Sequence, residues 1–329
     1  MNKYNLSLVF IFFVIINLTS SCGVFQVVAV DTTASLLSEA SKEIESETNL
    51  EMFKNGLPAN LKQMEGLLYL SPNNEKLLVS LIKGYAAYSF VVLETEMMDA
   101  QLKGEENNPE LKEQLIVNYT KAFRYGLRLL KKNGVSYTDL IKASNKTNGI
   151  VSLLDSKLGT GNDLYFEGVL FIAQSLGGLV LSQKDRMDMV SQLPIVKSMF
   201  DWVCVKKPDI NFGACDIFYG IYEAGRPRML GGNPEKGKEI FLSFIKNNPN
   251  NWLGRTAYIR FYLLPMLDED GYNDQKFYLE KMSELFSQSK SWKVNRDWPV
   301  EMKNEGLRLY QSVAIRRFEI IKNNEEEIF

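Results

Sequence analysis

The chain has 329 residues, of which 45% are hydrophobic, and a formal net charge of −2. A chain of this length and apolar content can bury a sizeable core, and it offers no basic surplus that would attract nucleic acid or anionic lipid. It contains no histidine, which excludes Ser-His-Asp and Cys-His catalytic arrangements and every metal site with histidine ligands.

The first 21 residues have the pattern of a secretory signal peptide. Lys3 precedes a short apolar run, and small residues lead from this run to Cys22. The run is shorter than the roughly 20 residues that cross a bilayer, so we do not expect a spanning helix. Because the residues before Cys22 resemble a bacterial lipobox, we predict cleavage after residue 21 and a lipid on Cys22. Gly23 follows the cysteine, which by resemblance to lipoproteins in general favours the outer membrane. The alternative is an ordinary signal peptide with an incidental cysteine.

The chain beyond residue 22 repeats its apolar residues at helical spacing, and we find no convincing strand pattern. Residues 31–65 predict a first helix that breaks near Asn55–Pro58, and residues 145–161 predict a loop-rich segment. Further helices are expected at residues 75–98, 111–132, 137–143, 164–181, 185–206, 212–222, 234–246, 252–267, 274–289 and 299–322. The sequence therefore predicts an all-α fold.

One spacing pattern recurs in this helical region. A first residue is followed at intervals of four, three and five by a large apolar residue, a second apolar residue and a proline. The copies are Gly237, Phe241, Phe244 and Pro249; Val196, Phe200, Val203 and Pro208; Asn60, Met64, Leu67 and Pro72; and a weaker one at Ala122, Gly126, Leu129 and Gly134. This is the second-helix pattern of the tetratricopeptide repeat in degenerate form. We therefore predict a single elongated α-α superhelix over residues 57–329, preceded by a tether and first helix over residues 22–56.

Two segments carry a resemblance to a known family. The first is Leu70-Ser71-Pro72-Asn73, with Gly84 and Tyr85 in the helix that follows, and the second is Gly-Gly-Asn-Pro-Glu-Lys at residues 231–236. Over about residues 57–317 the chain resembles the T component of TRAP-type transporters. The resemblance implies a periplasmic lipoprotein with hidden tetratricopeptide-like repeats, which forms a homotrimer and joins the transporter's periplasmic solute-binding protein.

We expect a binding groove on the concave side of the array, which the first helix of each repeat lines. The helices concerned follow Pro72, Pro208 and Pro249. The side chains expected to face the groove are Lys76, Val79, Lys83, Ala86, Phe212, Cys215, Tyr219, Tyr222, Glu223, Arg260 and Leu263, with Arg226 at the rim. Aromatic rings with polar tips are common on ligand and partner surfaces, so we predict that Tyr219 and Tyr222 contact an apolar ligand or a partner segment. The alternative is that both tyrosines are core residues with bonded hydroxyls.

Cys204 and Cys215 lie on either side of Pro208 and could form a disulfide in an oxidising periplasm. Their spacing alone cannot establish the required Cα separation of less than about 7 Å. We favour the simpler interpretation of two small buried thiols.

The sequence carries none of the motifs that mark nucleotide-binding loops, dinucleotide folds or Cys-x-x-Cys redox sites. We therefore predict a non-catalytic protein without a cofactor, a metal or a nucleic-acid partner, which docks a solute-binding protein and could hold a small apolar ligand. Two alternatives stay open. One is a structural scaffold lipoprotein of the envelope, and the other is a hydrolase that uses carboxylates in a helical cleft.

Overall fold

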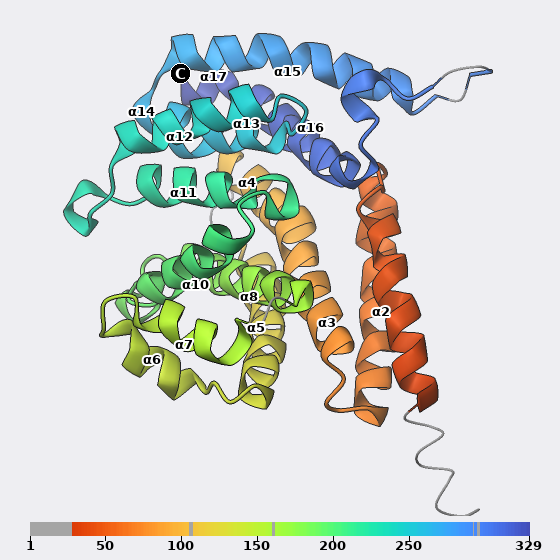
Figure 1. Cartoon of the computed structure of the whole chain (residues 1–329). Helices are drawn as coiled ribbons and strands as arrows, with labels where there is room; N and C mark the ends of the chain where they lie inside the picture. Colours follow the sequence, from red (N-terminus) through yellow and green to blue (C-terminus); the bar gives the residue numbers. More distant parts are fainter. Residues whose placement is uncertain (1–27, 105–107, 160–161, 292, 295–296) are drawn as a thin grey trace, which may run out of the picture.

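The computed structural model describes residues 28–104, 108–159, 162–291, 293–294 and 297–329. The predicted signal peptide and the lipidation site at Cys22 lie outside these residues. Within the described ranges every regular element is a helix, and no strand occurs (Figure 1). The all-α fold predicted from the sequence is therefore confirmed.

The N-terminal half is built around one long helical run. α3 (Glu75–Tyr88) passes through a π-helical segment, η1 (Ser89–Leu93), directly into α4 (Glu94–Leu102). Three helices pack against α3, namely α2 (Leu50–Leu70), α5 (Pro109–Lys132) and α8 (Asp163–Ser182). Residues 28–44 are also helical, and Asp31 accepts hydrogen bonds from Ser71 and Asn74 in the turn after α2.

Shorter helices complete this half. α6 (Tyr137–Ser144) and α7 (Gly149–Leu158) lie between α5 and α8 in the chain, and α9 (Met187–Val190) precedes α10 (Leu193–Lys206). α10 packs against both α7 and α8. Gly126 of α5 permits the close approach of α8, because a Cβ at this position would lie 2.4 Å from Cγ1 of Ile172. A larger residue at position 126 would push the two helices apart.

The C-terminal half consists of further helix pairs. α11 (Ala214–Ala224) and α12 (Pro234–Asn247) form one pair, joined by a turn that contains η3 (Arg228–Leu230). α12 packs on α13 (Leu253–Tyr258), which continues through a second π-helical segment, η4 (Ile259–Leu263), into α14 (Leu264–Met266). α15 (Glu269–Ser289) and α16 (Arg308–Lys322) form the next pair. The remaining short elements are η2 (Ile210–Phe212), η5 (Val300–Met302), η6 (Glu305–Leu307) and α17 (Glu325–Ile328).

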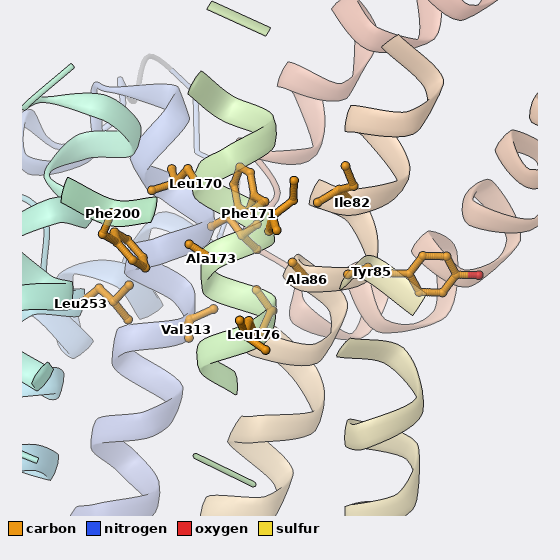
Figure 2. Close-up of a cluster of buried hydrophobic side chains, with 14 of the residues drawn as sticks. Ile82, Tyr85, Ala86, Leu170, Phe171, Ala173, Leu176, Phe200, Leu253 and Val313 are labelled. Atoms are coloured by element: carbon orange, nitrogen blue, oxygen red, sulfur yellow. The ribbon is translucent and has the colours of Figure 1, made fainter. Parts of the chain in front are cut away.

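The last long helix closes the array. α16 packs against α13 and also against α4, so the two halves of the chain meet (Figure 1). Arg317 of α16 is buried at this junction; its Nε donates a hydrogen bond of 3.0 Å to Oγ1 of Thr95, and its Nη2 donates to the carbonyl oxygen of Phe90. Side chains from α3, α8, α10, α13 and α16 belong to one continuous core there (Figure 2).

The helix break predicted near Asn55–Pro58 is wrong. α2 runs unbroken through Pro58, and the chain instead leaves the helical conformation before Asn49, whose side chain caps α2 by accepting from two backbone N–H groups. Pro58 removes one backbone hydrogen bond from the helix, but Leu57 and Leu61 near it are buried in the core. Burial of this apolar face therefore outweighs the local effect of the proline.

The loop predicted at residues 145–161 is also wrong, because it contains α7. Ile150, Leu154 and Leu158 are buried at intervals of four residues, which defines one apolar helical face. Conversely, the long helix expected from residue 299 begins only at Arg308, after two short 3-10 turns.

The recurring spacing pattern marks buried positions in three of its four copies. The buried residues are Gly237, Phe241 and Phe244 on α12, Val196, Phe200 and Val203 on α10, and Ala122, Gly126 and Leu129 on α5. In the remaining copy Met64 is buried, but Asn60 is exposed and Leu67 is half-buried. That copy therefore marks only one residue of the buried face of α2. The predicted domain boundary at residue 57 lies within α2.

Two helical runs are long and apolar enough to span a membrane, Glu75–Leu102 and α8. Of their most apolar stretches, however, 67% and 61% are buried inside the protein, which is typical of core helices rather than of lipid-facing ones.

Phe241→Ala should lower the free energy of unfolding by about 3–5 kcal/mol, because it empties a fully buried aromatic position. Phe277→Ala is the matched control: Phe277 is 78% exposed, so its loss should change stability by no more than about 0.5 kcal/mol. Denaturant unfolding followed by circular dichroism measures both. A loss below about 1 kcal/mol for Phe241→Ala would show that this ring does not hold the helix pair together.

Candidate functional site

An apolar cavity of about 570 Å3 lies where the two halves of the chain meet. It is walled by α8, α10 and α11, by the two π-helical runs and by α16. Apolar side chains dominate its walls, among them Leu170, Leu193, Val196, Phe200, Ile217 and Leu253. Its volume falls within the range of roughly 300–1,000 Å3 that is usual for small-molecule sites.

The segment that carries α11 into the cavity wall has an unusual backbone. Asn211, Phe212 and Gly213 all have positive φ, at 48°, 57° and 88°. Two side chains from the C-terminal half hold this segment: Tyr310 donates a hydrogen bond of 2.7 Å to Oδ1 of Asn211, and Asn251 donates one of 2.9 Å to the carbonyl oxygen of Phe212. Conformations of this kind persist only where surrounding contacts fix them.

A disulfide joins Cys204 of α10 to Cys215 of α11, with their Cα atoms 5.8 Å apart. The interpretation of Cys204 and Cys215 as two free buried thiols is therefore wrong. The bond spans the positive-φ segment and fixes α11 against α10 at the edge of the cavity.

The inner face of α11 adds an aromatic stack to the cavity wall. Phe218 stacks on Phe200 with ring centroids 3.6 Å apart, and Tyr222 lies 5.6 Å from Phe218. The guanidinium carbon of Arg226 lies 3.6 Å from the centre of the Tyr222 ring. Arg226 also donates hydrogen bonds to the carbonyl oxygens of Leu230 and Gly231, so it fixes the loop after α11. Because Leu230 lines the cavity and is exposed, the cavity reaches solvent at this loop.

A buried charged cluster forms another part of the wall. Tyr119 donates a hydrogen bond of 2.6 Å to Oε1 of Glu94, and Oε2 of Glu94 lies 3.6 Å from Nη2 of Arg317. Burial lowers the pKa of Arg317 to about 10, while the Glu94 carboxylate opposes this shift. Burial also raises the pKa of Tyr119 well above its usual value. At neutral pH Arg317 is therefore charged and Tyr119 is a neutral hydrogen-bond donor.

Arg260 completes the cluster but is not hydrogen-bonded within it. Its Nη1 lies 4.0 Å from Oε2 of Glu94, which is beyond hydrogen-bond distance. This Nη1 is buried and has no hydrogen-bond partner among the described residues. Glu94 directly follows η1 and Arg260 belongs to η4, so both are positioned by π-helical segments, which are frequent at functional sites.

Three of the binding residues predicted from the sequence line the cavity: Tyr222, Arg226 and Arg260. Four others face neighbouring helices. Tyr219 donates a hydrogen bond of 2.8 Å to Asp201, and Glu223 pairs with Lys236 at 2.8 Å.

The other two, Phe212 and Lys83, are likewise occupied. The Phe212 ring packs edge-on against Tyr310, and Lys83 forms ion pairs with Glu45 and Glu167. The remaining groove candidates also lie outside the cavity lining: Val79, Ala86 and Leu263 are core residues, Lys76 donates to Ser35, and Cys215 forms the disulfide.

Within the charged cluster, Arg260 is the one residue that the sequence predicted as a binding residue. Glu94 follows the apolar stretch of η1, and Arg317 lies within a helix whose surrounding residues are mostly buried. Neither charge stands alone in its stretch, because Glu96 follows Glu94 closely and Arg316 directly precedes Arg317. The local sequence therefore does not distinguish these two charges from their neighbours.

A family model described as TRAP transporter T-component matches residues 46–282, which is well over half of the chain. A search of curated proteins finds no match.

Tyr222→Ala should weaken the binding of a neutral apolar probe such as Nile red about tenfold, because the variant loses an aromatic wall of the cavity. The melting temperature should change little, since Tyr222 is only half-buried. Tyr219→Phe is the matched control: it lies three residues away, outside the cavity lining, and should bind the probe as the wild type does. A variant at Tyr222 that melts much earlier yet binds normally would identify this ring as a core residue instead.

Proposed function

The chain belongs to the TRAP transporter T-component family, and on this basis we propose that it is a non-catalytic lipoprotein that docks the transporter's solute-binding protein and holds a small apolar ligand. The family places it among the components of TRAP-type transporters. The docking and the ligand are our proposal.

The main support for the proposed ligand-holding role is the apolar cavity at the junction of the two halves. A protein with only a scaffolding role has no need for a ligand-sized cavity, whereas transport requires that a solute be held and passed on.

Met229 is 90% exposed in the loop beside the cavity, next to Leu230 in the cavity lining. Methionine side chains are flexible and common at surfaces that bind other proteins, so this tip suits such a contact. We therefore place the docking of the solute-binding protein at this loop.

The hydrolase alternative has little support from the cavity. Acid–base hydrolysis by carboxylates uses a pair of them. Glu94 is the single acidic residue among the described residues that line the cavity, and Tyr119 and Arg317 already engage it. A role without catalysis accounts for this arrangement better.

The location of the protein is proposed from the N-terminal sequence. The signal peptide and Cys22 support a lipid anchor in the periplasm, and Gly23 supports the outer membrane. The homotrimer is proposed from the family resemblance alone.

A photo-crosslinking experiment tests the docking. The mature protein, carrying benzoylphenylalanine in place of Met229, is irradiated in envelope extract of the native bacterium, and the products are identified by mass spectrometry. We expect a crosslink to the TRAP solute-binding protein. The same group in place of Phe277, which is 78% exposed on α15, serves as the control and should give none. Crosslinks from position 229 to envelope structural proteins, with none to a solute-binding protein, would favour the scaffold alternative.

A further inference from the structure

We propose that the cavity selects an apolar ligand with a single anionic group, and that Arg260 binds this group. The inference rests on the proposed ligand-holding function and adds the chemical class of the ligand.

The cavity wall carries more basic than acidic residues. Among the described residues that line it, Glu94 is acidic, and the basic residues are Lys184, Arg226, Arg260 and Arg317. Uncompensated charge beside apolar walls is unfavourable. The low dielectric strengthens the repulsion between like charges, and burial removes the water that would solvate them. An anion inside the cavity would compensate it, whereas a neutral or cationic ligand would not.

The partners of each basic residue identify the one that is free to bind. Arg317 is engaged by Thr95, by the Phe90 carbonyl oxygen and by Glu94. Arg226 donates to three backbone carbonyl oxygens and lies near Glu223. Lys184 is exposed to solvent, which screens its charge. Arg260 remains: its side chain is mostly buried, and its Nη1 has no hydrogen-bond partner in the described part of the chain.

The geometry of Arg260 fits a carboxylate or a similar oxyanion. A guanidinium offers five N–H donors and no acceptor, and it binds planar oxyanions through two parallel hydrogen bonds. The Phe261 ring, whose centre lies 5.2 Å from the guanidinium carbon, restrains the side chain. Since Phe261 also lines the cavity, the anionic group would meet Arg260 while the apolar part of the ligand meets the aromatic and aliphatic walls.

The cluster also limits the number of charges on the ligand. Glu94 lies 4.0 Å from Arg260, and its carboxylate would repel a second anionic group placed near the first. The cavity should therefore prefer an apolar monoanion to a compact dianion.

The test compares dodecanoate with dodecanol, which has the same chain length and no charge. Binding is measured at pH 7.4 by displacement of Nile red from the mature polypeptide, with Cys22→Ala so that no lipid is attached. We expect dodecanoate to bind at least tenfold more tightly than dodecanol. Decylmalonate carries two carboxylates on one carbon and is a compact dianion at this pH, so it should bind more weakly than dodecanoate.

Variants then assign the preference to one residue. Arg260→Gln should abolish the preference for dodecanoate and leave the affinity for dodecanol unchanged, and Arg260→Lys should retain part of it. Arg255→Gln is the matched control on the same helical run, because Arg255 bonds to Gln275, stacks on Tyr278 and does not line the cavity. It should behave as the wild type. Circular dichroism spectra establish that each variant is folded, and the two ligands on the wild type test the preference even if Arg260→Gln does not fold.

The outcomes separate the two proposals. Equal binding of dodecanoate and dodecanol by the wild type would overturn the anion selection but keep the apolar site. A preference that survives in folded Arg260→Gln would overturn the role of Arg260. If the wild type binds neither compound nor Nile red, the ligand-holding function itself is wrong.

Discussion

The closure of the helical array depends on Arg317. This residue lies on the last long helix and bonds to a side chain 222 positions earlier in the chain, so it joins the C-terminal half to the N-terminal half. The π-helical segment η1 makes the contact possible. The N–H of Glu94 bonds to the carbonyl oxygen of Ser89, one residue further back than in an α-helix. The carbonyl oxygen of Phe90 thereby loses its α-helical partner, and it accepts from Arg317 instead.

The two arginines of the charged cluster have different roles as a result. Arg317 stabilises the fold, because its hydrogen bonds and the Glu94 carboxylate compensate the burial of its charge. Arg260 lies beside the same carboxylate but at 4.0 Å, and its positive charge contributes to lowering the pKa of Arg317. A protein that needed Glu94 only to pair with Arg317 would gain nothing from a second guanidinium there. The proposed anionic ligand would give this second guanidinium a function and would relieve the repulsion between the two.

Local sequence patterns predicted the helices well and the closure of the array poorly. The hairpin of α11 and α12 could be predicted because Asn233 caps α12, Pro234 begins it, and Phe241 and Phe244 define its buried face. On α11 the same periodicity placed Tyr219 and Tyr222 together, but only the contact with Asp201 on α10 shows that Tyr219 faces a neighbouring helix. Glu94 and Arg317 could not be paired from the sequence, since nothing local encodes a contact across the whole domain.

The most direct test of this account compares the unfolding free energies of Arg317→Gln and Arg260→Gln without ligand, by urea denaturation. Arg317→Gln should lose about 3–5 kcal/mol, because it breaks a buried, hydrogen-bonded charge pair. Arg260→Gln should change stability by less than about 1 kcal/mol, or increase it, because it removes a charge that the fold does not use. Equal losses of several kcal/mol in both variants would contradict the account, since Arg260 would then be a structural partner of Glu94 rather than a residue held for a ligand.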